Sequence, residues 1–575
     1  MKISKNKVAQ IFREISDFLS IKGENPFRIR AYEKAADALE HLSGDLEELY
    51  QRGKLKGVPG IGKGMLEKIE VLLSTGTLPA YEQLRAEFPP GLVEILSIPE
   101  VGPKTVKLLY EKVGVKSVDD LEMAIQSHKL RNLPGMGAKT EENIVKGLKL
   151  YRMRRSRILL GTALPLVGEV ILELRERASS WIEKISPAGS LRRGKETIGD
   201  IDILVTSSNP SSLMDAFTTL SFVNDILAKG ETKSSILTPQ GLQIDLRVVA
   251  PESFGAAIQY FTGSKSHNIN LRERAIKRGL KINEYGVFTQ EGKKIAGERE
   301  EEVYHCLDLS FIPPELREDR GEIEAAEEGK LPHLLTEEDI KGDFHMHTTG
   351  SDGRDSIEDM IQRAREKGYQ YIAITDHSSS LKVARGLSEQ DVLSQAERIK
   401  KINSSLNNFR VFSGTEVDIR ADGTLDFSDE VLKKLDIVIA AVHTGFKQDE
   451  RKMTSRVIKA LQNPYVKILA HPTGRLLGER EAYAIDLNKV MQVAKDRGIW
   501  LEVNSQPQRL DLNDVWAREA KRRKIPIVIN TDAHNKQSLD LIKLGVVTAR
   551  RGWLEKEDVI NTLPLDKLLT LLNKK

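Results

Sequence analysis

Two aspartates spaced two residues apart, Asp200 and Asp202, are the first residues whose types and spacing indicate chemistry. They open the alternating run Asp200-Ile201-Asp202-Ile203-Leu204-Val205, which predicts a strand with both carboxylates on one face. A third acid, Asp245, lies in a second alternating run over residues 242–249. Neighbouring carboxylates repel each other unless a proton or a cation lies between them, and their hard oxygen atoms favour Mg²⁺ or Mn²⁺. The three acids therefore predict a two-metal site for phosphoryl transfer.

A loop suited to phosphate precedes these aspartates. Gly189 and Ser190 offer backbone amides and a hydroxyl, and Arg193 adds a planar guanidinium that suits phosphate oxygens. The alternative is a pair of surface strands with solvated acids. Because Gly-Ser, the arginine and Asp-x-Asp occur together and in this order, the catalytic interpretation is favoured.

Histidines and acids gather in the C-terminal part of the chain, where six of the eleven histidines lie between His345 and His534. Apolar runs alternate there with helical patterns, over residues 343–347, 371–375, 411–417, 437–442, 467–470, 500–503 and 525–530. This alternation predicts parallel strands in a distorted barrel of seven β/α units, a fold that carries its chemistry at the C-terminal ends of its strands. The candidate metal ligands at those ends are His345, His347, Asp352, His377, Glu416, His443, His471, Asp532 and His534. His345 and His347 are two apart on a predicted strand, so both imidazoles should reach one side.

The first 150 residues contain three similar glycine loops, each followed by a helical pattern. They recur about every 35–40 residues, which indicates a repeated unit. Glycines allow a tight turn that exposes backbone amides at a helix N-terminus, where the helix dipole favours a phosphate oxygen. One such loop is more often a plain connection, but three of them predict DNA binding. The candidate contacts are Gly60, Gly62, Gly102, Lys104, Gly135 and Gly137. A basic cluster follows at Arg152, Arg154, Arg155 and Arg157, which suits either phosphate contact or a solvated helix face.

Composition narrows the class of protein. The 575 residues include 87 basic and 84 acidic ones, and a net charge of +3 allows nucleic-acid binding without establishing it. Residues 315–341 hold ten acids against four bases and predict an acidic linker. The single cysteine, Cys306, excludes an internal disulfide framework and a cysteine-based zinc site. With no apolar run near 18 residues, we expect a cytoplasmic chain without a membrane span.

Residues 1–315 resemble the X-family of DNA polymerases, whose archetype is polymerase beta. The Gly-Ser and Gly-Asp-x-Asp elements are shared with other nucleotidyltransferases, but Tyr260-Phe261-Thr262-Gly263-Ser264 also resembles the family's nucleotide-pocket segment. The resemblance implies that Asp200, Asp202 and Asp245 hold Mg²⁺ or Mn²⁺. It implies nucleotide contacts at Gly189, Ser190, Arg193, Tyr260, Phe261, Gly263, Asn268 and Arg272. Lys265 departs from the archetype, which has an acid at this position.

The segment at residues 27–36 and the first glycine loop resemble the family's small DNA-end-binding domain. Lys68 aligns there with the lysine that forms a Schiff base in members that remove 5′-deoxyribose phosphate. Gly64 stands where the archetype has another lysine. A DNA-phosphate contact or a solvated helix residue explains Lys68 equally well, so lyase activity stays open.

Residues 340–575 resemble the PHP (polymerase and histidinol phosphatase) family, and all nine positions of its ligand pattern are present. The resemblance implies three ions of Mn²⁺, Zn²⁺ or Fe²⁺, which mixed nitrogen and oxygen ligands do not distinguish. By position, Arg420 or Arg475 is a candidate for binding the phosphate.

The order of these segments resembles the bacterial X-family polymerases. The expected domains are a helical DNA-end-binding domain (1–80), a second helical domain (81–150), a palm and nucleotide-pocket domain (151–314), an acidic linker (315–340) and a PHP domain (341–575). We expect a monomeric gap-filling repair polymerase that uses deoxynucleoside triphosphates on gapped or nicked DNA. Its PHP site would act as a 3′–5′ exonuclease, with endonuclease action at abasic sites also open. The alternatives are a non-catalytic scaffold for DNA ends and a phosphatase of small-molecule phosphates.

Overall fold

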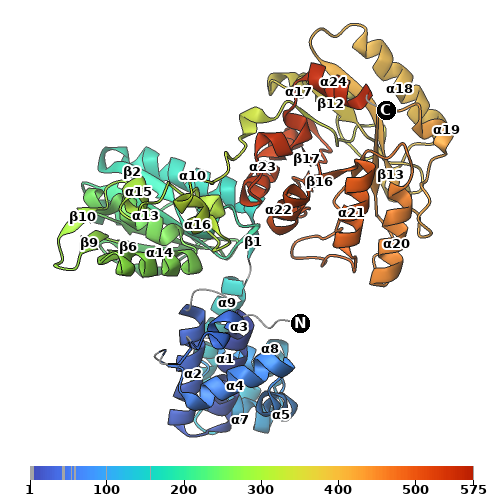
Figure 1. Cartoon of the computed structure of the whole chain (residues 1–575). Helices are drawn as coiled ribbons and strands as arrows, with labels where there is room; N and C mark the ends of the chain where they lie inside the picture. The colour runs from blue at the N-terminus through green and yellow to red at the C-terminus, as the bar shows by residue number, and fades with distance from the viewer. Residues whose placement is uncertain are drawn as a thin grey trace.

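The computed structural model describes residues 5–573 apart from 42–45, 54, 57, 59, 99 and 156. The chain forms an N-terminal helical part, a central α+β part and a C-terminal barrel (Figure 1). This architecture confirms the fold class predicted from the sequence. Among the described helices, none has the length and apolar character that a membrane crossing requires.

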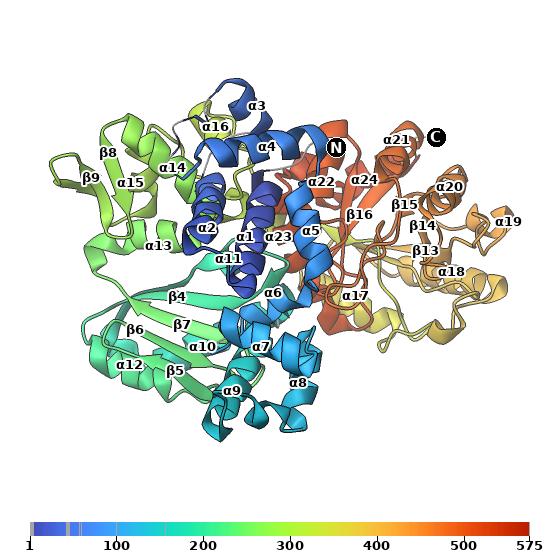
Figure 2. The ribbon, with the colours of Figure 1, turned by 90° about the horizontal axis from the view of Figure 1, so that it is seen from below.

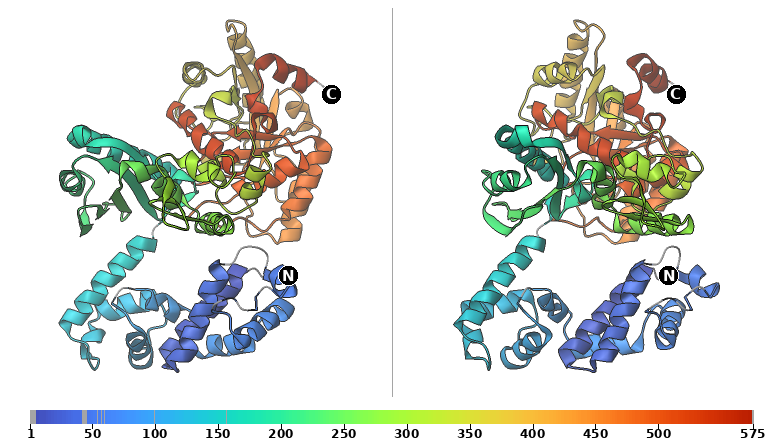
Figure 3. Two further views of the ribbon diagram at one scale, coloured as in Figure 1. Left: turned by 60° about the vertical axis from the view of Figure 1, so that its left-hand side comes forward. Right: turned by 90° about the vertical axis from the view of Figure 1, so that its left-hand side faces the viewer.

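The described residues of the N-terminal part form helices and turns around one continuous apolar core. Its helices are α1 (Lys5–Lys22), α2 (Pro26–His41), α3 (Leu46–Gln51), α4 (Lys63–Thr75), α5 (Pro79–Glu87), α6 (Gly91–Leu96), α7 (Pro103–Val113), α8 (Val118–Gln126) and α9 (Ala138–Arg155). The helices α4, α7 and α9 begin directly after the three glycine loops, as predicted, although Pro59 and Pro99 of those loops lie outside the described residues. Figure 3 shows α9 leading from this part toward the rest of the molecule.

The central part is built on a five-stranded sheet with the order β2-β4-β7-β6-β5. The strands are β2 (Ile182–Pro187), β4 (Asp200–Ser207), β5 (Asp225–Lys229), β6 (Lys233–Leu237) and β7 (Gln243–Val248). The two strands predicted from alternation, β4 and β7, are neighbours and run parallel. Helices α10 (Leu160–Ala178) and α12 (Pro210–Thr218) contribute apolar residues to the core beside this sheet.

A smaller lobe follows the sheet. It comprises α13 (Phe254–Thr262), α14 (Lys265–Lys277), α15 (Glu300–His305) and an antiparallel sheet of β8 (Leu280–Asn283), β9 (Gly286–Thr289) and β10 (Lys294–Ala296). The acidic segment continues from this lobe as a packed connection containing the short helix α16 (Glu322–Glu327). Leu316 and Ile323 enter the core of the lobe, and the fully buried Arg317 pairs with Glu300 at 2.6 Å. Apolar contacts and a buried ion pair therefore hold this segment against the lobe.

The C-terminal part contains all seven predicted strands, paired in parallel in chain order. They are β11 (Gly342–Asp343), β12 (Tyr371–Ile374), β13 (Arg410–Asp418), β14 (Ile437–Ala441), β15 (Ile468–Leu469), β16 (Trp500–Asn504) and β17 (Ile527–Asn530). A bridge between Met346 and Ala533, just beyond the ends of β11 and β17, nearly closes the barrel. The accompanying helices are α17 (Ile357–Glu366), α18 (Glu389–Asn403), α19 (Asp429–Leu432), α20 (Glu450–Leu461), α21 (Leu487–Arg497), α22 (Asp514–Arg523), α23 (Ile542–Arg551) and α24 (Leu565–Asn573).

The barrel and the palm share one apolar core. Leu510 and Leu544 of the barrel part are fully buried among palm residues such as Leu160 and Ile198. Figure 2 shows α23 between the palm and the barrel strands. Because apolar burial of this kind is the main stabilising contribution at an interface, the two parts should keep a fixed relative position.

Two candidate active sites

The first site lies where β4 and β7 carry their acids. Parallel pairing places Asp202 opposite Asp245, and Asp200 lies two residues earlier on the same face of β4. Asp245 is held by Lys233 Nζ at 2.8 Å and by Gln243 Nε2 at 2.7 Å. The structure thus brings together the three carboxylates that the sequence predicts as one set.

Asp202 and Asp245 differ in how easily they lose a proton. Burial, followed by the charges of Asp200 and Asp245, raises the pKa of Asp202 to about 6. Burial acts in the same direction on Asp245, but hydrogen bonds from Lys233 and Gln243 hold its pKa below the usual value. Partly buried carboxylates that repel each other are suited to divalent cations, which supply the missing positive charge.

The phosphate loop packs directly against Asp202. Gly189 starts the short helix α11 (Gly189–Arg192) with φ at 61°, and a β-carbon there would lie 2.7 Å from Asp202 Oδ2. Only glycine allows both this backbone conformation and this close approach. The loop, Asp200 and Asp202 all line a pocket of about 510 Å³.

The predicted nucleotide-binding segment lines the same pocket. Tyr260 and Phe261 meet edge to face, with ring centroids 5.1 Å apart. Asn268 donates to the Tyr260 carbonyl at 2.7 Å, and Arg272 Nε donates to the Asn268 carbonyl at 3.2 Å. Gly263 also lines the pocket, so all eight predicted nucleotide contacts lie around it.

Two cations that line the pocket were not among the predicted nucleotide contacts. Arg157 and Lys195 both line it, and Arg157 Nε donates to Thr197 Oγ1 at 2.8 Å. The signal for Arg157 was its place in the basic cluster, of which the side chains of Arg152, Arg154 and Arg155 lie outside the described residues. Lys195 follows the Arg192-Arg193-Gly194 turn, and its position in the phosphate loop was an available signal.

The second site lies at the rim of the barrel, where all nine predicted ligands converge. Their ligand atoms form three overlapping groups, each with all atoms within 4.8 Å of one another. The groups are His347, Asp352, His377 and His534; His345, His347 and Asp532; and His377, Glu416 and His443. His471 joins them through Nε2, 2.9 Å from Glu416 Oε1. The sharing of His347 and His377 between groups links the three into one cluster.

One geometric detail of the prediction is wrong. The strand β11 ends at Asp343, so His345 and His347 do not lie on it but flank Met346, which forms an isolated bridge to Ala533. The regular ladder stops there because the backbone amides of Phe344 and His345 donate to side-chain oxygens, at 3.1 Å to Asn530 Oδ1 and at 3.0 Å to Asp343 Oδ1. The two imidazoles still meet, with ring centroids 5.2 Å apart.

The donor atoms of this cluster fit metal ions. The Nε2 atoms of His345 and His347 are buried without a hydrogen-bond partner among the described residues, although carboxylate oxygens lie 3.2–3.6 Å away. Burial opposes the charge of Glu416, but His443 and His345 keep its pKa well below the usual value. Unpaired imidazole nitrogens facing ionised carboxylates form a donor set of the kind that divalent transition metals bind.

A second layer of acids orients these ligands. The buried Glu502 accepts from His345 Nδ1 at 2.7 Å and from the His471 backbone amide at 2.8 Å. Asp418 accepts from His443 Nδ1 in the same way. Such contacts fix which imidazole nitrogen faces the metal. A lone acid in the apolar strand run at residues 500–503 was the sequence signal for Glu502.

The two arginines predicted as candidates for binding the phosphate form ion pairs with other residues of the chain. Arg420 pairs with Asp426 at 2.8 Å, and Arg475 makes two contacts with Glu196 of the palm, at 2.6 and 3.1 Å. A different cation, Arg509, lies beside the cluster, with Nε 3.6 Å from Asp532 Oδ2. It follows β16 in the loop Gln506-Pro507-Gln508-Arg509, which sequence reasoning did not single out.

The predicted DNA contacts of the helical part lie at helix starts. Gly62 and Gly102 are the residues that precede α4 and α7, and Gly60 and Gly135 have positive φ values of 98° and 77°. Lys68 lies on α4, with Nζ 5.8 Å from the centre of the Tyr32 ring and 3.0 Å from the Gly64 carbonyl oxygen.

Known proteins match all three parts of the chain. The chain matches the helix-hairpin-helix domain over residues 4–78, the SAM-like helix-hairpin-helix tandem over 92–150, the DNA polymerase beta thumb over 257–318 and the PHP domain over 343–506. It is 39% identical over 573 residues to the DNA polymerase/3′-5′ exonuclease PolX of Bacillus subtilis, covering 99% of both chains. The chain therefore belongs to the family of X-family DNA polymerases that carry a PHP domain.

Other relatives match the PHP part alone. A probable phosphatase of Thermoanaerobacter sp. is 29% identical over 231 residues, which cover 38% of this chain and 89% of that protein. A probable phosphatase of Caldanaerobacter subterraneus is 30% identical over 246 residues, which cover 40% of this chain and 91% of that protein.

The contact between Glu502 and His345 predicts an effect on metal binding. We expect Glu502→Gln to weaken metal binding by roughly 10- to 100-fold, because His345 loses the carboxylate that orients it. Metal content after dialysis against graded chelator measures this, with the exposed Glu430→Gln as the control. Equal metal retention in both variants would show that Glu502 does not support the cluster.

Proposed function

We propose that this chain is a gap-filling DNA polymerase that extends a primer with deoxynucleoside triphosphates and trims 3′ ends at its PHP site. The observation that carries the proposal is a single pocket lined by the phosphate loop, Asp200 and Asp202, with Asp245 paired opposite Asp202 on the neighbouring strand. The second set of ligands, complete at the barrel rim, supports the trimming activity.

In the polymerase site, Asp200, Asp202 and Asp245 would hold two ions of Mg²⁺ or Mn²⁺. Bound there, the ions would lower the pKa of the primer hydroxyl and stabilise charge on the phosphates. Gly189, Ser190 and Arg193 bind the triphosphate, with amide, hydroxyl and guanidinium donors. Tyr260 and Phe261 lie against the sugar, Gly263 lets the backbone approach it, and Asn268 and Arg272 contact the minor-groove side of the new base pair.

In the helical part, the amides at Gly60, Gly62, Gly102, Gly135 and Gly137 and the ammonium of Lys104 bind DNA phosphates. These contacts are independent of sequence, as phosphate contacts are in general. The position of Lys68 beside Tyr32 also allows a lyase reaction on a 5′-deoxyribose phosphate. The proposal places the chain as a monomer on gapped or nicked DNA in the cytoplasm, with the domain limits expected from the sequence.

In the PHP site, the nine ligands would hold three ions of Mn²⁺, Zn²⁺ or Fe²⁺. Six of them are buried, whereas Asp352, His443 and His534 are partly exposed, so a phosphodiester enters from that side. Arg509 binds a phosphate oxygen, because its guanidinium lies beside the ligand Asp532. The same geometry suits cleavage at an abasic site.

Separate variants should separate the two activities. We expect Asp202→Asn to lower primer extension by about a thousandfold or more and to leave 3′ trimming intact, because only one site loses a charge. Asp532→Asn should have the opposite effect. A labelled primer in a short gapped duplex, with Mn²⁺ and with or without the four nucleotides, reports both activities by product length. Loss of both activities in either variant contradicts the assignment to two sites.

Arg509 offers a test of phosphate recognition. We expect Arg509→Met to raise KM for 3′ trimming by about tenfold, because a cation that contacts the phosphate is lost while the ligands remain. Arg420→Met is the matched control, because the Asp426 pair keeps that cation from the substrate. Single-turnover trimming over a range of DNA concentrations gives the comparison, and similar curves for both variants would remove Arg509 from the site.

A small-molecule phosphatase is a second candidate, favoured by the two probable phosphatases that match the PHP part. The attached polymerase pocket argues for DNA as the substrate. Hydrolysis rates on sugar and nucleotide monophosphates, compared with those on DNA 3′ ends, decide between them.

A further inference from the structure

The phosphate loop of the palm, residues 189–196, packs against a helix of the PHP part. Gly194 lies in this loop, and a β-carbon there would lie 2.2 Å from Val547 Cγ1 of α23. On the same loop, Glu196 makes the two contacts with Arg475 described above. The loop that faces the nucleotide pocket on one side is therefore held by the PHP part on the other.

Arg551, at the end of α23, also contacts this loop. Its side chain is only 2% exposed. Nη1 donates to the Arg193 carbonyl at 2.6 Å and lies 3.1 Å from Glu318 Oε1. Nη2 lies 2.8 Å from Asp514 Oδ2 at the start of α22.

Glu318 carries the contact from Arg551 to the side chain of Arg193. The same Oε1 atom accepts from Arg193 Nε at 3.0 Å, and Lys195 Nζ lies 3.8 Å from Oε2. Burial alone would raise the pKa of Glu318, but Arg551 and Arg193 hold it below the usual value. The carboxylate is therefore a charged link between two arginines from different parts of the chain.

These contacts fix the orientation of Arg193. Glu318 holds Nε, and Nη1 donates to the Thr262 carbonyl. Nη2 has no hydrogen-bond partner among the described residues, and Arg193 lines the nucleotide pocket. Because a guanidinium is planar, anchoring two of its nitrogens sets the direction of the third.

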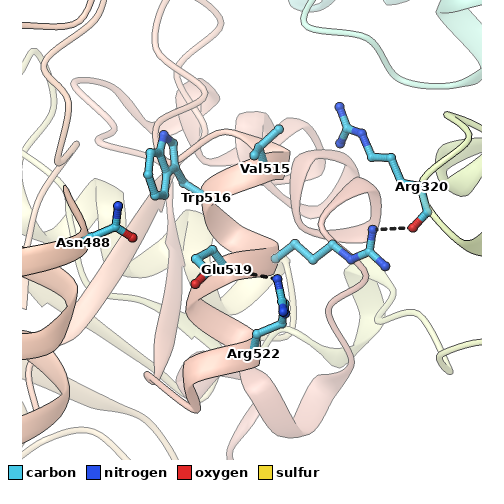
Figure 4. Close-up of a pocket in the computed structure, with 7 residues that line it drawn as sticks. Arg320, Asn488, Val515, Trp516, Glu519 and Arg522 are labelled. Carbon is cyan, nitrogen blue, oxygen red and sulfur yellow. Dashed lines mark hydrogen bonds and ion pairs between the residues drawn. The ribbon is translucent and has the colours of Figure 1, made fainter. Parts of the chain in front are cut away.

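The network extends to the molecular surface through Arg320, which pairs with the same Asp514 oxygen at 3.0 Å. Arg320 lines a pocket of about 600 Å³, opposite Trp516 and Asn488 (Figure 4). The two acids Glu318 and Asp514 thus form ion pairs with four cations, namely Arg193, Lys195, Arg320 and Arg551. This excess of positive charge favours an incoming triphosphate.

We propose that Arg551 of the PHP part is a positioning residue for nucleotide binding, which acts through Glu318 to aim Arg193 at the triphosphate. This inference rests on the proposed polymerase function. It means that the PHP part contributes to nucleotide affinity in addition to carrying its own site. Prepositioning a donor reduces the ordering cost at the moment of binding, so its loss should affect nucleotide affinity more than turnover.

The test uses full-length Arg551→Met, which keeps the aliphatic length and removes the guanidinium. We expect KM for the incoming nucleotide to rise about tenfold and kcat to change by less than about threefold. Arg550→Met is the matched control, because its neighbour on α23 pairs with Glu315 at 2.7 Å and does not contact Glu318 or Arg193 in the described structure. The control should leave KM unchanged, and trimming should be normal in both variants.

A second variant covers the case in which Arg551→Met does not fold. Glu318→Gln keeps the shape of the link and removes its charge, and we expect a similar rise in KM. When Arg551→Met and Glu318→Gln are combined, their effects on KM should be far from additive, because both substitutions act on one contact to Arg193. Arg551→Lys should restore only part of the affinity, because an ammonium cannot make the forked contact.

An unchanged KM in Arg551→Met or Glu318→Gln overturns the inference, and so does an equal rise in Arg550→Met, which would indicate a general loss of docking. Titration calorimetry with a non-hydrolysable deoxynucleoside triphosphate analogue measures affinity without extension. A wild-type chain that binds the analogue but does not extend a primer refutes the proposed function alone. The effect of Arg551→Met on the affinity then still decides the inference.

Discussion

Parallel pairing of strands is the constraint on which both candidate sites depend. In the palm, the parallel register of β4 and β7 sets Asp202 opposite Asp245, although 42 residues separate them. In the barrel, parallel order brings the C-terminal ends of all seven strands to one rim. The direction of the strands thus decides which acids and imidazoles can act together.

Placing side chains of like charge close together has an electrostatic cost, and local contacts offset this cost only in part. In the palm, Lys233 compensates Asp245 and leaves the more buried Asp202 with a raised pKa. In the barrel, Glu502 and Asp418 orient two of the imidazoles. Both arrangements leave oxygen and nitrogen atoms directed at space between the side chains. Divalent cations satisfy such atoms better than any further side chain could, because they combine double charge with small size.

The interface between the palm and the barrel makes the two halves one structure. Leu510 and Leu544 complete a core that belongs mainly to the palm. Over this core lies a network in which the acids Glu318 and Asp514 each contact more than one arginine. A buried carboxylate shared between cations is sensitive to the loss of either partner, because the remaining charge stays buried. The contacts that join the palm and the barrel therefore include Arg193, which lines the nucleotide pocket.

The sequence by itself determined the chemistry of both sites. Alternation around Asp200 and Asp245 predicted the palm strands, and the nine ligands followed from their positions after apolar runs, because side-chain type and strand period are local properties. Only the tertiary structure decided that Arg475 and Arg420 form ion pairs with acids of the chain. It also decided that Arg509 lies beside the cluster and that His345 follows β11. It alone paired Arg551 with Arg193, which lie 358 positions apart. Contacts of this range depend on which surfaces pack together and on how buried charges are neutralised, and no local pattern of residues encodes either.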